Sequence, residues 1–228
     1  MEIIEDLRQM RSFSSGSRDR GLRAVLVPTM GYLHDGHREL LRIGRRSGDI
    51  LILSIFVNPA QFGPKEDFIS YPRDMERDLK AARECGADVV FTPKREDIYP
   101  AGYGTYAEVE GLSARLCGAS RPGHFRGVAT VVLKLFNITL PRSAVFGRKD
   151  FQQLLIIRKM VEDFNLGVEI IGVDTVREPD GLAMSSRNAY LSVEEREAAR
   201  CVPASIEEAK EEFEKGVRDT SAIMEKVK

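Results

Sequence analysis

Three short apolar runs, separated by polar stretches of helical length, constrain the fold of this chain most strongly. The runs are residues 22–27, 50–57 and 88–92. Their length and their content of Val, Ile and Leu predict buried strands. The stretches between them, residues 36–46 and 72–85, predict helices, since Pro72 suits a helix start and Gly86 a helix end. Such alternation with short links is typical of a parallel sheet with right-handed crossovers.

The chain beyond residue 92 is less regular but continues this α/β pattern. Residues 144–146 indicate a short strand that runs into a helix near residues 150–163, and residues 168–173 indicate a further strand. Residues 106–110 are a candidate strand. Residues 128–136 are either a helix or a buried strand, because their β-branched content fits both. We therefore predict about five parallel strands with helices on both faces of the sheet.

The composition changes near Thr175, where we place a domain boundary. Ser192 and Glu195 have the spacing of a capping box that opens a charged helix, and the rest of the chain to Lys228 is rich in Glu, Lys and Ala. The sequence thus predicts a larger domain over residues 1–175 and a small C-terminal domain over residues 176–228.

The net charge and the cysteines indicate which binding partners and which cellular compartment to expect. The formal net charge is -1, so no sequence-wide basic field attracts nucleic acid or an anionic membrane. The cysteines lie far apart and are Cys85, Cys117 and Cys201, which argues against a disulfide framework and fits a reducing cytosol. The longest apolar run is far too short to span a bilayer, and the start of the chain does not resemble a secretory signal. We expect a soluble cytoplasmic protein.

Two histidines at a predicted strand-to-helix turn are the first candidates for chemistry. His34 and His37 flank Asp35 and Gly36 at the expected start of a helix, where free N–H groups and a partial positive charge attract phosphate. Both imidazoles can donate hydrogen bonds to a phosphoryl group, and Gly36 lets the backbone approach a ligand. A zinc pair is an alternative, but no cysteine lies nearby and His124 is the only other histidine. Two solvated loop histidines are another. The turn between strand and helix favours the nucleotide interpretation.

The usual nucleotide signatures are absent from the sequence. It contains neither the P-loop pattern G-x-x-x-x-G-K-[ST] nor the dinucleotide pattern G-x-G-x-x-G. Binding of ATP or NAD through those loops is therefore unsupported, and any phosphate site has to be built from other residues.

Other segments carry polar groups at expected strand ends and loops. Lys149 can neutralise phosphate and Asp150 can cap a helix after the strand at 144–146, where open parallel sheets bind ligands. Residues 184–187 pair two hydroxyls with the Arg187 guanidinium, which suits phosphate oxygens. Side-chain amides and an Arg- and Gly-rich loop complete the set, at Asn58, Gln61, Gln153 and residues 121–127. Taken singly, each segment is equally or better explained as an ordinary turn, cap or surface group.

Together and in this order, the segments resemble the pantothenate synthetase family. The matching strings are Pro28-Thr29-Met30-Gly31, His34-Asp35-Gly36-His37, Phe56-Val57-Asn58-Pro59-Ala60-Gln61-Phe62, Arg121-Pro122-Gly123-His124-Phe125, Lys149-Asp150-Phe151-Gln152-Gln153 and Asp180-Gly181-Leu182-Ala183-Met184-Ser185-Ser186-Arg187-Asn188. They run from about residue 25 to residue 195. One tetrapeptide would be weak, whereas this colinear set is very specific.

The resemblance implies a Rossmann-like nucleotide- and pantoate-binding domain and a smaller C-terminal cap domain that closes over ATP. It implies a Mg²⁺-dependent ligase of the coenzyme A pathway, in which pantoate attacks the ATP α-phosphate and β-alanine then displaces AMP from pantoyl adenylate. No protein-bound metal site, nucleic acid or membrane partner is implied, and a homodimer is expected. By position, the catalytic residues are His34, His37, Lys149 and Arg187. The ATP-binding residues are Met30, Gly31, Tyr32, Leu33, His34, Asp35, Gly36, His37, Gly147, Arg148, Lys149, Asp150, Val176, Met184, Ser185, Ser186 and Arg187. The substrate-binding residues are Gln61, Gln153, Asn58 and Arg121.

Three departures from the family pattern accompany the resemblance. Arg148 stands where the family usually has Glu, and Cys117 stands where it usually has an acidic residue. The family usually continues beyond Lys228, so we expect a shortened cap domain, which would affect turnover more than ATP binding. Two alternatives stay open: another nucleotidyltransferase, which would not need Gln61 and Gln153, and a truncated relative that binds nucleotide without catalysis.

Overall fold

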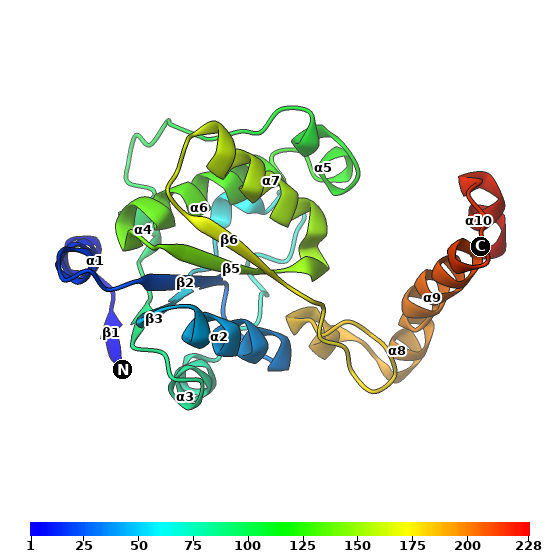
Figure 1. Cartoon of the computed structure of the whole chain (residues 1–228), viewed down its shortest axis with the longest axis horizontal. Helices are drawn as coiled ribbons and strands as arrows, with labels where there is room; N and C mark the ends of the chain where they lie inside the picture. The colour runs from blue at the N-terminus through cyan, green and yellow to red at the C-terminus, as the bar shows by residue number, and fades with distance from the viewer. The chain divides into compact units, whose positions relative to one another are not determined.

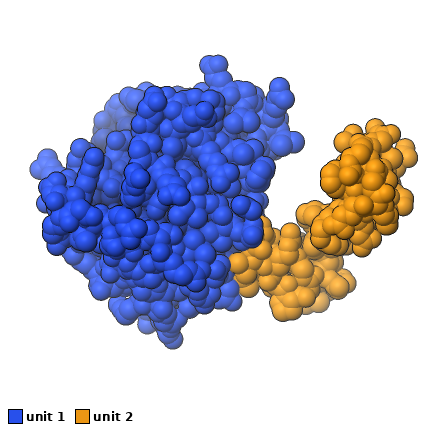
Figure 2. Space-filling view, in the orientation of Figure 1, with its two compact units in different colours: residues 1–174 blue, residues 175–228 orange.

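The computed structural model describes all residues, Met1–Lys228, and they form two compact units. Unit 1 is Met1–Asp174 and unit 2 is Thr175–Lys228 (Figure 2). The division between the units falls beside the boundary that the composition change predicts near Thr175. None of the helices combines the length and the apolar character that crossing a membrane requires.

A six-stranded parallel sheet forms the centre of unit 1, in the order β1-β4-β3-β2-β5-β6. The strands are β1 Glu2–Ile4, β2 Ala24–Thr29, β3 Ile50–Ile55, β4 Val89–Phe91, β5 Ser143–Gly147 and β6 Glu169–Val173. The predicted parallel sheet is confirmed, with β1 as an additional strand. Only Ile4 of β1 is buried, so this edge strand leaves no apolar run in the sequence.

The helices of unit 1 connect these strands and cover both faces of the sheet (Figure 1). They are α1 Leu7–Asp19, α2 Asp35–Ser47, η1 Pro59–Gln61, α3 Met75–Glu84, α4 Arg95–Ile98, η2 Leu112–Ala114, α5 Cys117–Ser120, α6 His124–Thr139, η3 Arg148–Asp150 and α7 Phe151–Asp163. The α1 helix has no predicted counterpart, because two of its three buried residues are Ser14 and Ser17 and its apolar stripe is weak. The α3 helix begins after the predicted Pro72, since the Asp74 carboxylate caps it by accepting from Arg77 N.

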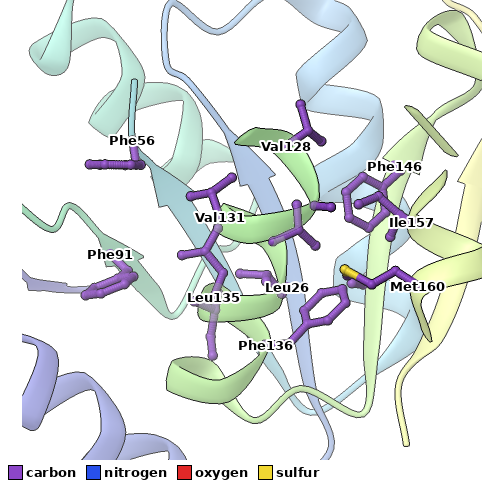
Figure 3. Close-up of a cluster of buried hydrophobic side chains, with 14 of the residues drawn as sticks. Leu26, Phe56, Phe91, Val128, Val131, Leu135, Phe136, Phe146, Ile157 and Met160 are labelled. Carbon is purple, nitrogen blue, oxygen red and sulfur yellow. The ribbon is translucent and has the colours of Figure 1, made fainter. Parts of the chain in front are cut away.

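The two faces of the sheet bury two separate apolar clusters, as expected for a parallel sheet covered on both sides. Figure 1 shows α2 and α3 on one face and α6 and α7 on the other. On the latter face, Leu26, Phe91 and Phe146 of the sheet pack with side chains of α6 and α7 (Figure 3). The residues that α6 and α7 contribute there include Val128, Val131, Leu135, Phe136, Ile157 and Met160.

Three local predictions are decided by tertiary contacts. Residues 128–136, which fit a helix or a strand, lie in the α6 helix. Residues 106–110 are not a strand: Ala107 N donates to the Thr130 hydroxyl on α6 (3.0 Å) in place of a sheet partner. Strand β2 continues past the predicted end at Pro28. Its pairing with β5 involves only Val25 and Leu26, so the missing Pro28 N–H breaks no bond on that side.

Unit 2 consists of a bridged turn followed by short helices. Arg177 and Ala183 form an antiparallel bridge, and the helices are η4 Ser186–Tyr190, α8 Val193–Ala199, α9 Cys201–Glu214 and α10 Thr220–Lys226. The predicted capping box is present: the Ser192 hydroxyl accepts from Glu195 N (3.1 Å), and Ser192 N donates to the Glu195 carboxylate (2.9 Å).

Candidate active site

The order in which the chain adds strands to the sheet reverses between β2 and β5. Two of the predicted site segments follow these two strands. The chain proceeds from β2 to β3 and β4 on one side, and then crosses to β5 and β6 on the other. The loops that follow β2 and β5 therefore leave the same edge of the sheet side by side, where open α/β sheets bind ligands. We call residues 30–37, which follow β2, the histidine corner. The segment at the end of β5 is residues 147–150.

Two residues near the start of the histidine corner have a left-handed conformation. Gly31 has φ 85° and Tyr32 has φ 53°. The fully buried Asp78 carboxylate on α3 accepts hydrogen bonds from Tyr32 N (2.7 Å) and Leu33 N (2.6 Å). A Cβ at Gly31 would lie 2.9 Å from that carboxylate and would be strained at this φ, so the corner requires glycine there. Asp78 thus holds the loop in its strained shape.

Asp78 is a site residue that our sequence reasoning missed. Its signal was present: an acidic residue shares the buried face of a helix with Ala81 and Ala82, at the spacing expected for apolar residues. A carboxylate at such a position needs hydrogen-bond donors, and here the loop supplies them. Burial raises the pKa of Asp78, while its two backbone N–H bonds act in the opposite direction.

The two histidines are oriented by the backbone at the start of α2. His34 is the N-cap, and its Nδ1 accepts from Gly36 N (3.1 Å). His37 Nδ1 accepts from His34 N (3.3 Å), and the ring centroids are 4.1 Å apart. A backbone N–H can only donate, so each neutral ring must carry its proton on Nε2. Both imidazoles therefore have an Nε2–H donor on the side opposite the capping bonds.

The environment keeps His37 neutral at physiological pH. Burial lowers the pKa of His37 to about 3, and electrostatic interactions with His34 and Lys149 act in the same direction. Lys149 belongs to the segment after β5, which leaves the sheet at the same edge as the histidine corner because β5 pairs with β2. The histidine corner provides a neutral N–H donor and the segment after β5 provides a cationic amino group, and both suit anionic oxygen.

The remaining residues of the segment after β5 have different surroundings. The Arg148 guanidinium pairs with Asp174 (2.8 Å), and both side chains are mainly exposed. Asp150 occupies the N-cap position of α7, but its side chain makes no capping bond, so the predicted Asp150 cap is wrong. The physical reason is that the tight turn Arg148–Asp150 leads directly into α7.

A second polar cluster, which we call the amide corner, consists of Asn58 and Gln61 at the end of β3. Asn58 is 1% exposed, and its side chain makes four hydrogen bonds. Its Oδ1 accepts from Ala60 N (3.3 Å) and the Tyr99 hydroxyl (2.8 Å), and its Nδ2 donates to Gly127 O (3.1 Å) and Gln61 Oε1 (3.0 Å). Its hydrogen-bonding capacity is therefore fully used by the protein. Asn58 is predicted to bind substrate, but this geometry suits it to hold Gln61 instead.

Gln61 is held through its main chain as well. His124 Nδ1 lies 2.8 Å from Gln61 O, and His124 Nε2 lies 3.1 Å from a nitrogen of Arg121. Arginine only donates, so Nε2 accepts and the Nδ1–H donates to Gln61 O. Helix α6 also packs closely against the backbone of Ala60, next to Gln61. A Cβ at Gly127 on α6 would lie only 2.2 Å from Ala60 O.

Arg121, predicted to bind substrate, is paired within the protein. Its guanidinium donates to both carboxylate oxygens of Glu66, at 2.8 and 2.5 Å, and the pairing lowers the pKa of Glu66. Only about a quarter of either side chain is exposed, at 28% and 25%. Glu66, a residue without a predicted role, thereby fixes Arg121, which in turn orients His124.

Gln153 and Gln152 lie in the first turn of α7. Gln153 is half-buried. Gln152 accepts from Cys117 N (3.1 Å) and donates to Leu112 O (2.9 Å) and Arg115 O (2.7 Å), so it fastens the segment around Cys117 to α7. Adjacent helix residues point in different directions, which leaves Gln153 on another side of the helix.

The predicted residues of unit 2 are organised around its bridged turn. Met184 N donates to Val176 O (3.0 Å), and the Ser185 side chain caps η4 by accepting from Arg187 N (3.2 Å). The Arg196 guanidinium on α8 contacts Glu178 (2.6 Å) and Asp180 (2.7 Å), which closes the turn against the helix. Val176 and residues 184–187 thus form one local structure within unit 2.

No group of three or more His, Cys, Asp or Glu side chains is placed to hold a metal ion. The N–H groups of the histidine corner and the cationic Lys149 side chain fit phosphate oxygens and do not fit Mg²⁺.

Comparison with known proteins places this geometry in a family. The profile of the family described as Pantoate-beta-alanine ligase matches residues 2–228. A protein named pantothenate synthetase from Geobacter sulfurreducens is 56% identical over 227 residues, which cover 100% of this chain and 80% of the relative. One of that name from Syntrophotalea carbinolica is 58% identical over 210 residues, covering 92% of this chain and 74% of the relative.

Solved structures agree with the sequence comparison. A crystal structure of pantothenate synthetase from Thermus thermophilus matches with a TM-score of 0.93 and 45% identity, covering 100% of this chain and 82% of that one. A pantoate-beta-alanine ligase from Francisella tularensis, complexed with beta-gamma ATP and beta-alanine, matches with a TM-score of 0.85 and 39% identity, covering 90% and 78%. The chain therefore belongs to the pantoate-beta-alanine ligase family.

Proposed function

We propose that this chain condenses pantoate with β-alanine, using ATP and passing through enzyme-bound pantoyl adenylate. Family membership supports the substrates. The observation that carries the mechanism is the pair of Nε2–H donors which the backbone fixes at the start of α2, near the Lys149 amino group.

In the first step, a carboxylate oxygen of pantoate attacks the α-phosphorus of ATP. The new bond joins that oxygen to phosphorus, the bond from phosphorus to the bridging oxygen breaks, and pyrophosphate leaves. His34, His37 and Lys149 stabilise the negative charge that develops on the phosphate oxygens. This step transfers no proton, so the neutral His37 acts as an N–H hydrogen-bond donor to the phosphate oxygens and not as an acid–base catalyst. No covalent enzyme nucleophile is required.

In the second step, the amine nitrogen of β-alanine attacks the acyl carbon of pantoyl adenylate. A carbon–nitrogen bond forms, the carbon–oxygen bond to the phosphate breaks, AMP leaves, and the amine proton passes to water. We assign pantoate binding to Gln61 and Gln153. Neutral amides hold a carboxylate without the full counter-charge that would weaken it as a nucleophile, and much of the acceleration then comes from positioning two anions together.

We assign ATP binding in unit 1 to residues 30–37 and 147–150. For Val176 and residues 184–187 of unit 2, a role in ATP binding stays a prediction from the family resemblance, with Arg187 as the positive charge. Mg²⁺ is expected to bind the triphosphate of ATP, which is its usual mode of binding. A homodimer remains a prediction, which light scattering would test.

Pyrophosphate release from ATP and Mg²⁺ tests the proposal directly. We expect release to require pantoate and to become multiple-turnover when β-alanine is added. Pantoate labelled with ¹⁸O in its carboxylate should deliver one labelled oxygen to AMP, because the oxygen that attacks phosphorus stays on AMP when the amide forms.

Each contrary result has a distinct meaning. Label in inorganic phosphate instead of AMP would exclude the acyl adenylate. Nucleotide binding without pantoate-dependent pyrophosphate release would favour a non-catalytic relative. Release that depends on a phosphorylated acceptor instead of pantoate would favour another nucleotidyltransferase.

A further inference from the structure

The hydrogen bonds of the amide corner fix which atom of Gln61 faces a ligand. The side-chain oxygen and nitrogen of Asn58 are distinguished by main-chain partners: Ala60 N can only donate to Oδ1, and Gly127 O can only accept from Nδ2. The second hydrogen on Nδ2 points to Gln61 (3.0 Å), so the Gln61 atom in that place must be the acceptor Oε1. The Gln61 NH₂ group is thereby turned the other way.

The outward NH₂ group of Gln61 lies beside the histidine corner. Its nitrogen Nε2 donates one hydrogen to the Met30 sulfur, 3.2 Å away, and Met30 belongs to the loop after β2. Sulfur is a weak acceptor, and the second hydrogen is left for a ligand. Rotating the amide by half a turn would oppose two donors at Asn58 and leave an NH₂ group unsatisfied, so the orientation is determined.

Tyr99, at the end of α4, contributes the remaining bond of this arrangement. Its hydroxyl donates to Asn58 Oδ1 at 2.8 Å, across 41 residues of sequence. Its ring centroid lies 5.1 Å from that of Tyr103 and 6.4 Å from that of Phe56. The ring contacts are therefore separate from the hydrogen bond of the hydroxyl. Burial raises the pKa of Tyr99, which keeps the hydroxyl a donor at physiological pH.

We propose that Tyr99 is a positioning residue that acts through Asn58 to present the Gln61 NH₂ group as a donor to a substrate oxygen. The inference rests on the proposed function, in which that oxygen belongs to pantoate. Tyr99 and Asn58 do not touch the substrate; they select an acceptor group at this position and reject a donor. The effect of Tyr99 should therefore be confined to pantoate and absent for ATP.

The principal test compares Tyr99→Phe with Tyr103→Phe. Both substitutions remove one hydroxyl from the same aromatic stack and keep the rings, but only the Tyr99 hydroxyl bonds to Asn58. We expect Tyr99→Phe to raise the KM for pantoate roughly five- to ten-fold, the loss of one buried hydrogen bond, with the KM for ATP within about two-fold of wild type. Tyr103→Phe should leave both KM values within about two-fold.

Several results would overturn the inference, and thermal unfolding of both variants accompanies the kinetics. A wild-type KM for pantoate in Tyr99→Phe, or equal increases in the KM for pantoate and ATP, would show that Tyr99 does not orient Gln61. If the wild-type chain itself shows no pantoate-dependent pyrophosphate release, the proposed function fails, and this outcome is distinct from a failure of Tyr99→Phe alone.

A measurement on the wild-type chain covers the case in which Tyr99→Phe does not fold. The Asn58 side-chain NH₂ is buried and both its hydrogens are bonded, so we expect slow exchange of these hydrogens with solvent by NMR. Exchange as fast as that of an exposed asparagine would mean that Asn58 does not hold Gln61, and the proposal would be wrong.

Discussion

The histidine corner and the amide corner lie at the carboxyl ends of neighbouring strands, β2 and β3, but they are held in different ways. The histidines are oriented by capping bonds that span two and three residues. Asn58 and Gln61 are oriented by partners 41, 63 and 69 residues away, namely Tyr99, His124 and Gly127. One corner is thus built largely by local sequence and the other by the packing of α4 and α6. Substitutions at the two corners should therefore have different effects on activity and stability.

The largest effect is expected when a phosphate-facing donor of the histidine corner is removed. His37→Ala should lower the single-turnover rate of adenylation by about 10²–10³-fold, as expected for the loss of one preorganised donor. Rapid-quench measurement of pantoyl adenylate tests this, with Arg42→Ala, an exposed position on the same helix, as the matched control. A loss of less than about three-fold in His37→Ala would remove His37 from the catalytic set.

The next effect concerns the one distant support of the histidine corner. Asp78→Asn replaces a carboxylate that accepts from two main-chain N–H groups with an amide that also carries donors. We expect a loss of about 1–3 kcal/mol in the free energy of unfolding and a higher KM for ATP. Denaturant unfolding and kinetics check both. Glu76→Gln, at an exposed position of α3, should change stability by less than about 0.5 kcal/mol. Equal effects of the two substitutions would deny Asp78 its structural role.

A smaller effect is expected at the ionic support of the amide corner. Glu66→Gln weakens the pair that fixes Arg121, and through it His124 and Gln61. The KM for pantoate should rise roughly two- to five-fold, consistent with about 1 kcal/mol for a charge-assisted bond. Glu39→Gln, which breaks ion pairs on the surface of α2, is the control and should leave that KM unchanged. A change in the KM for ATP alone would contradict the connection to Gln61.

A final effect concerns stability instead of kinetics, as a difference in acid sensitivity between the wild type and a His37 variant. Folded His37 binds its proton only near pH 3, whereas an unfolded histidine binds it near the ordinary pKa of 6.5. Between these values the unfolded chain holds more protons, so the free energy of unfolding falls as the pH falls. His37→Gln lacks this group and should lose less stability than wild type between pH 7 and pH 5, measured by denaturant unfolding. Identical pH dependence would show that His37 is not kept neutral by the fold.

The comparison also explains which parts of the site were predictable. The parallel sheet, the histidine pair and the capping box at Ser192 follow from patterns that are local in sequence, and the structure contains all three. The sequence identified Asn58 and Arg121 as polar groups near a strand end or in a loop. It did not identify the protein groups to which they bond in the folded structure. Whether a side chain faces a ligand or another protein group depends on segments that meet only after folding.

The sequence by itself determined the order of strands and helices along the chain, the start of α2 and, through its colinear motifs, the family. These features depend on periodicity and on groups within one helical turn of each other. Only the tertiary structure decided that Asp78 supports the loop after β2, that Glu66 pairs with Arg121, and that Tyr99 and Asn58 orient Gln61. The physical reason is that a buried polar group must find its partner wherever packing places one, and sequence separation gives no information about that distance.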